Sequence, residues 1–590
     1  NQSISSRPSW VPAFVDRVER LVRRDRNHPC VFMWSLGNEN GDGDNFEQCY
    51  AKVKSLDPRP VHHESSHRDG RPYGGVRFSD VYSVMYPGMD WMDRNTSNLD
   101  KPMFLCEYAH AMGNAIGNLR EYWEVIESSN ACIGGCIWDW VDQAIYDPQE
   151  IKQGVYRLHT GYDYPGPHQG NFCSNGVIPA TREESSKLKE VKAVYQFVKF
   201  DLKSVDKAKN QVEVEILNKY NFTSLAEFDL VYEVVKNGYV VSQKRVAMPD
   251  LATYKSQTFT LKLSKASILK AEKSGDELML NLRLVRRDAT LYAEADHEEA
   301  QEQFELVGRA SLAKIASKGA PLAQTSALHE IRIANDKIAV AFDAETGRMT
   351  ELVMDGRQVI THGEGFIYDN HRWIENDTFG NVSNGLEAKG EISVEQVDGN
   401  VVVKTRRGGS HCATQINYTI YPQGVMDIEA TFSPQHDNLR RAGLVCGIDS
   451  TLNKVDYYAY GPWENAVDHK EGVMVGRYST SVKDMVGQYV KPQTTGYREG
   501  LREVVFSDDK GFGVKIQTEG NVNFSALPYT DEDMMNAKHY WDMTSRPYTV
   551  LHLDAYMRGL GNASCGPGTL REYYVPNKPM SYKLRFSTVK

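Results

Sequence analysis

The periodicity of the chain changes once, near residue 200, and this change constrains the fold more than any other feature. Before residue 200, short apolar runs alternate with amphipathic segments, which is typical of strand–helix units around a parallel sheet. Beyond Phe200, apolar and polar residues alternate with a period of two, as where Val212 and Val214 flank Glu213. The sequence therefore predicts an α/β region followed by all-β domains.

The α/β region has the apolar periodicity of several strands and helices. The expected strands are 31–36, 61–64, 81–86, 103–108 and 133–140. The expected helices include 11–24, 46–55, 119–128 and 187–198. Because 590 residues exceed what one hydrophobic core supports, roughly two to four domains are expected in all.

The all-β part is expected to form a smaller and a larger sandwich. Asn237-Gly238 and Asp355-Gly356 each separate two apolar runs, which predicts hairpin turns, and the spacing of the strands suits sandwiches. The stretch 317–327 is rich in Ala, Ser, Gly and Pro, which is typical of a linker. The predicted domains are 1–198 (α/β), 199–316 (smaller sandwich) and 328–590 (larger sandwich), with 317–327 as the linker.

Composition and charge argue against several classes of protein. The net charge of -10 argues against nucleic-acid binding, and the densest basic run, 17–26, contains Glu19 and Asp25, as a solvated helix face does. The nine cysteines lack Cys-x-x-Cys spacing, so free thiols and no cysteine-bound metal are expected. No apolar stretch approaches the roughly 20 residues of a membrane span, and no signal peptide opens the chain. Since the chain starts at Asn1 without Met, we expect a fragment or a processed product.

Two glutamates follow apolar strands, one in Asn38-Glu39 and the other at Glu107. Active sites of parallel α/β barrels lie at the C-terminal ends of the strands, so the two side chains can meet there. Glycoside hydrolysis needs two carboxyl groups, one to protonate the leaving oxygen and one to attack the anomeric carbon. Burial near a second negative charge is expected to raise the pKa of one of them. We therefore predict a catalytic pair, while either glutamate alone also fits a hydrogen-bonded structural group.

Other side chains near these strand ends are candidates for sugar contacts. Asn38 can hydrogen-bond a sugar hydroxyl beside the reacting carbon. Trp138 and Trp140 offer indole faces for stacking on a pyranose, and the alternative is that they are core aromatics. Since no His-Glu-x-x-His or similar zinc spacing occurs, polar contacts are expected for His62, His63, His67 and His110.

The order of these motifs resembles that of the lactose-cleaving β-galactosidases of glycoside hydrolase family 2. The most specific match is the run 106–114, Cys-Glu-Tyr-Ala-His-Ala-Met-Gly-Asn. β-Glucuronidases and β-mannosidases share the Asn-Glu pair but not the run Ala-His-Ala-Met-Gly-Asn. Further matching motifs are 24–29, 34–39, 138–143, 171–176 and 461–465, so the resemblance spans nearly the whole chain.

The resemblance implies a fold and a reaction. The fold would be a partial (β/α)8 TIM barrel, strands four to eight, followed by an immunoglobulin-like β-sandwich and a large C-terminal β-sandwich. The reaction would be retaining hydrolysis of terminal β-D-galactosyl residues, with Glu39 as general acid/base and Glu107 as nucleophile about 5 to 5.5 Å apart. The resemblance also implies roles in substrate binding for Asn38, Tyr86, His110, Trp138 and Asn175.

Two metal ions and an assembly state are implied in the same way. Glu39 resembles one of three protein ligands of a magnesium ion, and the other two would precede the first helix, so that site is incomplete in this chain. The Phe172 carbonyl and Asn175 resemble ligands of a sodium ion. The implied substrate is a β-galactoside such as lactose, and the implied assembly is a homo-oligomer.

The sequence departs from the family pattern in two places. A tryptophan that forms a sugar platform would fall near Val550, where this chain has Pro-Tyr-Thr-Val, so the aglycone preference stays open. The family's jelly-roll domain, its first immunoglobulin-like domain and its first three barrel strands have no counterpart here. Because five strands leave two sheet edges exposed, we expect little activity from this chain alone.

Two other functions stay open from the sequence. The chain can belong to a β-glucuronidase or β-mannosidase of the same family, which hydrolysis of the corresponding aryl glycosides would reveal. It can also be a non-catalytic carbohydrate-binding or assembly fragment, which would keep sugar affinity and have no activity to lose.

Overall fold

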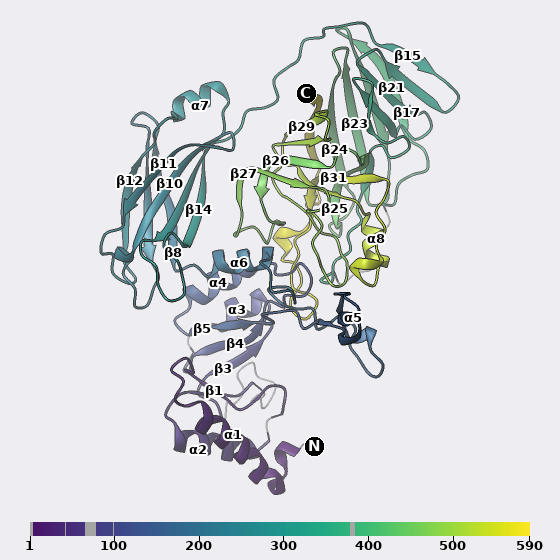
Figure 1. Ribbon diagram of the computed structural model, residues 1–590. Helices are drawn as coiled ribbons and strands as arrows, with labels where there is room; N and C mark the ends of the chain where they lie inside the picture. Colours follow the sequence, from purple (N-terminus) through teal and green to yellow (C-terminus); the bar gives the residue numbers. More distant parts are fainter. Residues whose placement is uncertain (1–3, 42, 65–77, 98, 378–383, 590) are drawn as a thin grey trace.

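The computed structural model describes residues 4–41, 43–64, 78–97, 99–377 and 384–589. The chain runs from an α/β segment (purple and blue in Figure 1) through a smaller β-sandwich (teal) to a larger β-sandwich (green and yellow). The predicted order of one α/β region and two all-β regions is therefore present. None of the helices within the described ranges is long and apolar enough to cross a membrane.

Parallel strands alternate with helices through the α/β segment. Strand β1 (Trp34–Ser35) pairs with β2 (Val61–His62), and β3 (Tyr82–Met85), β4 (Met103–Tyr108) and β5 (Cys132–Ile137) form a three-stranded parallel sheet in that order. The helices are α1 (Val11–Asp25), α2 (Asn45–Leu56), α3 (Met89–Asn95), α4 (Leu119–Ser128), α5 (Pro148–Ile151) and α6 (Ser186–Val194). Each of the five expected strands is found, although only β4 has the expected bounds. Helix α6 ends earlier than expected because strand β8 begins at Val198.

Asp80 connects the two parallel sheets. Its backbone N–H donates to the Val61 carbonyl at 2.7 Å, and its carboxylate accepts from the Val61 N–H at 2.8 Å. Lys54 Nζ of α2 contacts the same carboxylate at 3.0 Å. Nearby, His62 and Ser83 are joined at 2.7 Å between Nε2 and Oγ. These contacts hold β2 beside β3 and so join the two parallel sheets.

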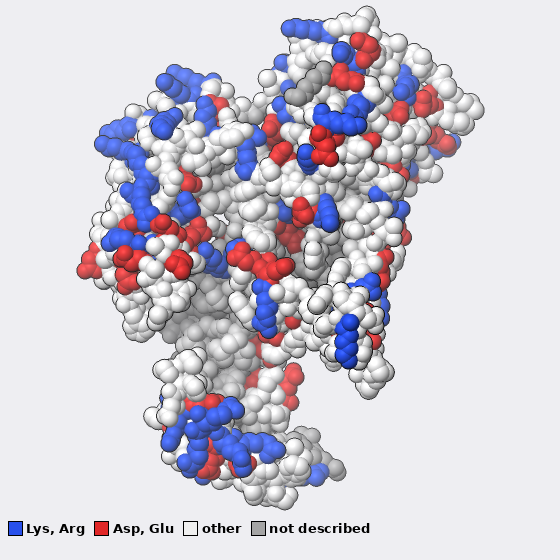
Figure 2. All heavy atoms as spheres, viewed as in Figure 1, with Lys and Arg blue, Asp and Glu red and all other residues white. Residues whose placement is uncertain are grey.

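Two apolar clusters form the core of the α/β segment. Val22 of α1 and Phe46 of α2 are buried against Trp34 and Val61 of the first sheet. The second cluster lies under the three-stranded sheet and contains Met103, Leu105, Tyr108, Leu119, Tyr122 and Ile126. On the solvent side of α1, Arg20 pairs with Asp16 and Arg23 with Glu19, and both charge signs lie together at this end of the molecule in Figure 2. The basic run is thus a solvated helix face, as predicted.

The smaller sandwich packs a four-stranded sheet against a three-stranded one. Their orders are β11-β10-β13-β14 and β12-β9-β8. Val212 and Val214 are buried and Glu213 is exposed, as the alternation predicts. Asn237 and Gly238 have φ of 49° and 81°, so the predicted hairpin turn is present. The bounds are β8 (Val198–Asp206), β9 (Gln211–Asn218), β10 (Phe228–Lys236), β11 (Tyr239–Ala247), β12 (Ser256–Lys262), α7 (Ile268–Ser274), β13 (Leu278–Arg286) and β14 (Glu298–Val307).

The larger sandwich contains two nine-stranded sheets over the described residues. The first has the order β15-β16-β17-β18-β19-β25-β31-β30, with β20 also pairing β25, and the second has the order β21-β22-β23-β24-β32-β29-β28-β26-β27. Strand β15 falls within the predicted linker 317–327, so part of that stretch belongs to a sheet edge. The bounds in the first sheet are β15 (Ala323–Ser326), β16 (Glu330–Ala334), β17 (Ile338–Asp343), β18 (Met349–Met354), β19 (Arg357–Ile360), β20 (Ile367–Asp369), β25 (Arg441–Asp449), β30 (Asn523–Leu527) and β31 (Tyr548–Met557). Those in the second are β21 (Glu391–Val397), β22 (Asn400–Arg407), β23 (Cys412–Tyr421), β24 (Val425–Pro434), β26 (Lys454–Gly461), β27 (Met474–Ser481), β28 (Glu503–Ser507), β29 (Gly513–Glu519) and β32 (Met580–Val589).

The larger sandwich contacts the α/β segment directly, near α4 and α6 (Figure 1). His469 Nδ1 lies 2.6 Å from the Ile116 carbonyl, and the N–H of Asn118 donates to the Asp468 carbonyl at 3.1 Å. These four residues are buried. The interface therefore fixes the loop that follows β4 against the sandwich.

Candidate active site

Glu107 lies near the end of β4 and is connected to the two preceding strand ends. The backbone N–H of Tyr86, just after β3, donates to the Glu107 carbonyl at 2.8 Å. The Tyr86 hydroxyl and the Asn38 side chain both hydrogen-bond the Glu107 carboxylate. Three separate strand ends thus converge on one half-buried carboxylate.

The pKa of Glu107 is raised above its ordinary value. Burial is the largest cause, and the charges of Glu39 and Glu64 add to it, whereas the hydrogen bonds from Tyr86 and Asn38 act in the opposite direction. Burial and the negative charge of Glu107 also raise the pKa of Tyr86, so the phenol stays protonated and donates. The negative charge of Glu39 thus acts on the carboxyl group of Glu107.

Glu64, which follows β2, is a third carboxylate in this group and was not predicted. Its Oε2 accepts a hydrogen bond from the backbone N–H of Glu39 at 2.8 Å. The side chain of Glu39 itself is exposed. Its sequence context, Val61-His62-His63-Glu64, lacks the apolar run that precedes Glu39 and Glu107.

Strained backbone occurs at three positions around these carboxylates. Glu39, Tyr86 and Ala109 have φ of 49°, 45° and 50°, in the left-handed region that non-glycine residues rarely adopt. Each such residue costs about 1–3 kcal/mol and persists only where its surroundings hold it. Strain of this kind gathers at functional sites.

His110 is buried beside Tyr86 and has one ring nitrogen available. Its Nδ1 lies 2.8 Å from Ser564 Oγ, and its ring stacks on Phe172 with centroids 5.2 Å apart. Its Nε2 is buried without a hydrogen-bond partner among the described residues. Burial lowers the pKa of His110 to about 4, so the ring is neutral near pH 7. A neutral ring with one unpaired nitrogen is suited to a hydroxyl ligand.

A loop of the larger sandwich reaches this site, and sequence analysis gave no sign of it. Besides Ser564, the loop brings Cys565 next to Tyr86 and Glu107. Burial and the charge of Glu107 raise the pKa of the Cys565 thiol. No sequence pattern reveals that residues 107 and 565 are neighbours, because only the interface between the α/β segment and the larger sandwich brings them together.

Trp138 follows β5 and is exposed, as is Trp140. The Trp138 carbonyl accepts from the Ala111 N–H at 2.8 Å, and the Trp138 N–H donates to the Tyr108 carbonyl at 3.2 Å. The alternative that these tryptophans are core aromatics is therefore wrong. An exposed indole beside the 108–111 segment is available for stacking on a ligand.

Asn175 is buried, and the oxygen of its side-chain amide has no hydrogen-bond partner among the described residues. Its backbone carbonyl accepts from the Asp139 N–H at 2.7 Å. Amide oxygens are among the ligands that hard cations prefer, so the unpartnered oxygen of Asn175 is chemically suited to the implied sodium ion. Within the described ranges, Glu39 belongs to no group of three metal-ligating side chains.

Lys187, at the start of α6, holds the segments that carry His110 and Asn175. Its fully buried Nζ donates to the carbonyls of Ala111, at 2.8 Å, and Gly176. Burial lowers the pKa of Lys187. Ala111 directly follows His110, and Gly176 directly follows Asn175. The Lys187 ammonium group therefore positions the backbone next to both candidate ligand-binding residues.

The predicted polar roles of the other histidines are confirmed where the structure describes them. His62 lies 3.0 Å from Ser35 Oγ through Nδ1 and also contacts Ser83, and His63 Nε2 lies 3.0 Å from Asn40 Oδ1. Burial lowers the pKa of His62 to about 4. His67 lies outside the described residues.

A cavity of about 480 Å³ lies elsewhere, between the α/β segment and the larger sandwich. It is lined by both parts, among them Asp142, Lys187, Trp463, Glu464 and Tyr489. Glu39 and Glu107 are not among its lining residues. We place the candidate site at Glu39 and Glu107 and not at this cavity. The charge of Glu39 acts on Glu107 there, and the backbone is strained at Glu39, Tyr86 and Ala109.

Comparison with known families gives three matches along the chain. Residues 1–200 match "Glycosyl hydrolases family 2, TIM barrel domain", residues 214–307 match "Beta-galactosidase, domain 4", and residues 334–586 match "Beta galactosidase small chain". The three matches follow one another and together cover most of the chain.

Two beta-galactosidases align with nearly the whole chain. A beta-galactosidase of Priestia megaterium is 31% identical over 94% of this chain and 54% of its own length, and one of Actinobacillus pleuropneumoniae is 29% identical over 99% and 57%. This chain therefore spans about half the length of these relatives. A galactose 1-epimerase structure from Lactobacillus acidophilus covers 46% of this chain at 9% identity and a TM-score of 0.28. With the family matches in chain order and relatives aligned over nearly its whole length, the chain belongs to glycosyl hydrolase family 2.

Proposed function

We propose that this chain carries the catalytic carboxylates of a retaining β-galactosidase, with Glu39 as general acid/base and Glu107 as nucleophile. The observation that carries the proposal is the surroundings of Glu107. Tyr86 and Asn38 donate hydrogen bonds to its carboxylate, and the charge of Glu39 acts on the same group. A positioned carboxyl group beside a second one is what double displacement at an anomeric carbon requires.

In the first step, a Glu107 carboxylate oxygen attacks the anomeric carbon of the galactosyl residue. The bond to the leaving oxygen breaks as Glu39 gives that oxygen its proton, which leaves galactose covalently attached to Glu107. In the second step, Glu39 takes a proton from water, and the water oxygen attacks the same carbon and releases Glu107. Two inversions retain the β configuration.

The remaining candidate residues would bind and orient the sugar. His110 offers its unpaired Nε2 and Asn38 its amide to hydroxyl groups, and Trp138 offers an exposed indole face. Asn175 and the Phe172 carbonyl would hold a sodium ion, which when bound supplies a fixed positive charge for sugar hydroxyls. Glu39 would supply one ligand of a magnesium ion.

Two alternatives are separated from this proposal by experiment. A β-glucuronidase or β-mannosidase would prefer the corresponding aryl glycosides, and a carbohydrate-binding or assembly fragment would bind sugar without turnover. The names of the relatives favour galactosides. A homo-oligomer is proposed from the family resemblance, and light scattering after gel filtration would measure it.

The natural gene product that contains this chain should be assayed with aryl β-galactoside, β-glucuronide and β-mannoside. We expect the galactoside to be hydrolysed with the highest kcat/KM and the first product in the proton NMR spectrum to be the β anomer. Glu107→Gln should abolish turnover, and Glu124→Gln, on the exposed side of α4, is the matched control. An α anomer as first product, or an active Glu107→Gln variant, would contradict the proposal.

A further inference from the structure

Three metal-ligating side chains meet where the α/β segment contacts the larger sandwich, outside the candidate active site. They are His159 in β7 (Leu158–His159), Asp163 at the end of a short 3-10 helix (Gly161–Asp163), and His539 in the sandwich. One ligating atom from each lies within 4.8 Å of the other two. The side chains are only 15%, 8% and 10% exposed, so the cluster is largely removed from solvent.

The distances in this cluster are close to those of a metal site. His539 Nε2 lies 2.7 Å from Asp163 Oδ1, and His159 Nδ1 lies 3.7 Å from Asp163 Oδ2. A tetrahedral zinc ion with ligands at about 2.0–2.1 Å holds neighbouring ligand atoms about 3.3 Å apart. One of these two separations is shorter and the other longer than this value, so small shifts of the side chains would bring both to the spacing of zinc ligands.

The second nitrogen of each imidazole is already bound to a carboxylate. His159 Nε2 lies 2.8 Å from Glu150 Oε2, and His539 Nδ1 lies 2.9 Å from Asp542 Oδ2. In protein metal sites, a histidine ligand usually donates its other N–H to a carboxylate or carbonyl, which fixes the tautomer. The pattern leaves Nδ1 of His159 and Nε2 of His539 as the nitrogens that face Asp163. Two independent carboxylates thus orient both rings as ligands.

Packing holds the two rings in place. Trp541 stacks on the His539 ring with centroids 4.3 Å apart and planes 10° apart, and its ring centroid lies 5.3 Å from that of His159. Ligands that are immobilised before an ion arrives lose less conformational entropy on binding it.

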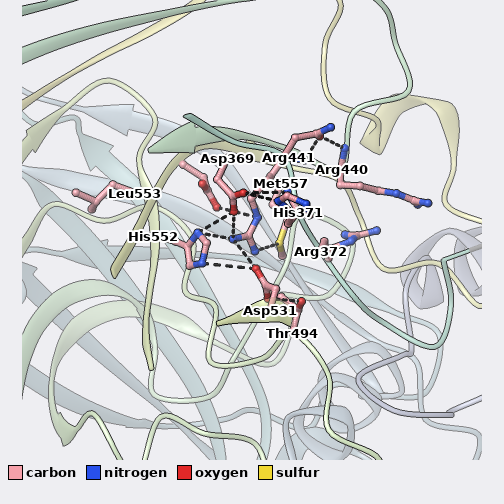
Figure 3. A network of polar contacts seen from close by, with 12 residues as sticks. Asp369, His371, Arg372, Arg440, Arg441, Thr494, Asp531, His552, Leu553 and Met557 are labelled. Carbon is pink, nitrogen blue, oxygen red and sulfur yellow. Dashed lines mark hydrogen bonds and ion pairs between the residues drawn. The ribbon is translucent and has the colours of Figure 1, made fainter. Parts of the chain in front are cut away.

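A second group of metal-ligating side chains already binds a cationic side chain of the protein. Asp369, Asp531 and His552 also bring ligating atoms together, but the Arg441 guanidinium lies among them (Figure 3). Its Nη1 lies 3.7 Å from Asp369 Oδ2 and 3.4 Å from Asp531 Oδ2, and it also contacts His552 Nδ1 at 2.5 Å. That guanidinium is fully buried.

The cation beside His159, Asp163 and His539 is the ammonium group of Lys538, which is exposed, whereas the Arg441 guanidinium is buried. Lys538 Nζ lies 3.1 Å from Asp163 Oδ1, and its side chain is 50% exposed. A flexible ammonium group at the surface can leave for solvent when a dication binds. The carboxylates of Glu150 and Asp542 behind the rings add negative charge that favours such an ion.

We propose that His159, Asp163 and His539 bind a divalent transition-metal ion of the zinc type, which ties the α/β segment to the larger sandwich. Two nitrogens and one carboxylate oxygen are a ligand set that zinc and its borderline neighbours accept, with water completing the coordination.

The test uses the whole chain, stripped of metal by a chelator and then titrated with Zn²⁺ and, separately, with Co²⁺. Because the chain has nine cysteines, the titrations are done with alkylated thiols, and the Co²⁺ spectrum should lack thiolate charge-transfer bands. We expect one ion per chain at this site. His159→Asn and His539→Asn should each weaken binding by at least about tenfold, and Glu150→Gln by about 10–100-fold. His297→Asn, which removes an exposed histidine of the smaller sandwich, is the control and should bind as the wild type does.

Lys538→Ala keeps the experiment decisive if a histidine variant unfolds. It removes the competing ammonium group and leaves all three ligands, so Zn²⁺ binding should become tighter. The proposal is overturned if the wild type takes up no stoichiometric Zn²⁺, if the double variant His159→Asn, His539→Asn binds it unchanged, or if Lys538→Ala binds it more weakly.

Discussion

Tyr86 and Glu107 are joined through both backbone and side chain at the ends of neighbouring parallel strands. The backbone N–H of Tyr86 donates to the Glu107 carbonyl at 2.8 Å, while its phenol donates to the Glu107 carboxylate. Tyr86 reaches this position with a φ of 45°. One strained residue thus fixes the main chain of the proposed nucleophile and stabilises its ionised form.

Tyr86→Phe should shift the acid limb of the pH–rate profile to higher pH. Glu107 must be ionised to attack, so activity is lost as the pH falls through its pKa. The Tyr86 hydrogen bond lowers that pKa, and its removal leaves burial and the Glu39 charge unopposed by the phenol. The pH dependence of kcat/KM measures the shift. A limb that stays in place or moves to lower pH would contradict the assignment of this hydrogen bond.

Ser564→Ala should weaken substrate binding more than catalysis. Ser564 holds His110 through Nδ1, which leaves Nε2 as the nitrogen that faces a ligand. Loss of one such hydrogen bond, worth ~0.5–1.5 kcal/mol, corresponds to an increase in KM of about twofold to tenfold with kcat nearly unchanged. Steady-state kinetics separates the two constants. An unchanged KM would mean that the sandwich loop plays no part in the site.

Lys187→Met should lower kcat/KM by about tenfold or more, because it leaves the Ala111 and Gly176 carbonyls without their shared donor and frees the adjoining residues to move. Methionine has nearly the volume of lysine, so the core need not collapse. Lys189→Met, in the same helix with its ammonium group on Glu184, is the matched control and should have wild-type kinetics. Equal kinetics for the two variants would remove Lys187 from the site's support.

Arg441→Met should lower the free energy of unfolding by about 3–5 kcal/mol, because it leaves several buried carboxylates without their cation. Asp369, Asp531 and Asp554 all lie within 4.0 Å of the Arg441 guanidinium. In contrast, Arg571→Met breaks an exposed pair with Asp437 and should cost no more than about 1 kcal/mol. Denaturant titrations of both variants test the difference, and similar losses would show that burial does not set the strength of the Arg441 cluster.

The fold could be predicted from the sequence where the pattern of neighbouring residues determines the local structure. Alternation placed Val212 and Val214 in the core of the smaller sandwich, and Asn237-Gly238 marked its turn, because strand period and turn conformation depend on neighbouring residues. The end of α6 was predicted too late, since the helical pattern continued to Val198, which pairs with Asn218 of β9 instead. Tertiary pairing decided that boundary, and no local pattern reveals it.

The candidate site was predictable to the same extent. Glu39 and Glu107 could be proposed because each stands at the end of an apolar run, whereas His62 and His63 precede Glu64 and no apolar run marks it. Ser564 and Cys565 could not be found, since they reach the site through the interface between the α/β segment and the larger sandwich. Lys187 gave no signal either, because a lysine at the start of a helix is ordinarily solvated and here is fully buried.

The most direct test of the account is covalent trapping of the nucleophile. The natural gene product that contains this chain should be treated with a 2-deoxy-2-fluoro-β-galactoside bearing a good leaving group, which slows release of the covalent intermediate, and then digested and analysed by tandem mass spectrometry. The account predicts one fluorogalactosyl group per chain, on Glu107, and none on the Glu107→Gln variant. A label on Glu39, Glu64 or any other residue, or turnover without a trapped intermediate, would contradict it.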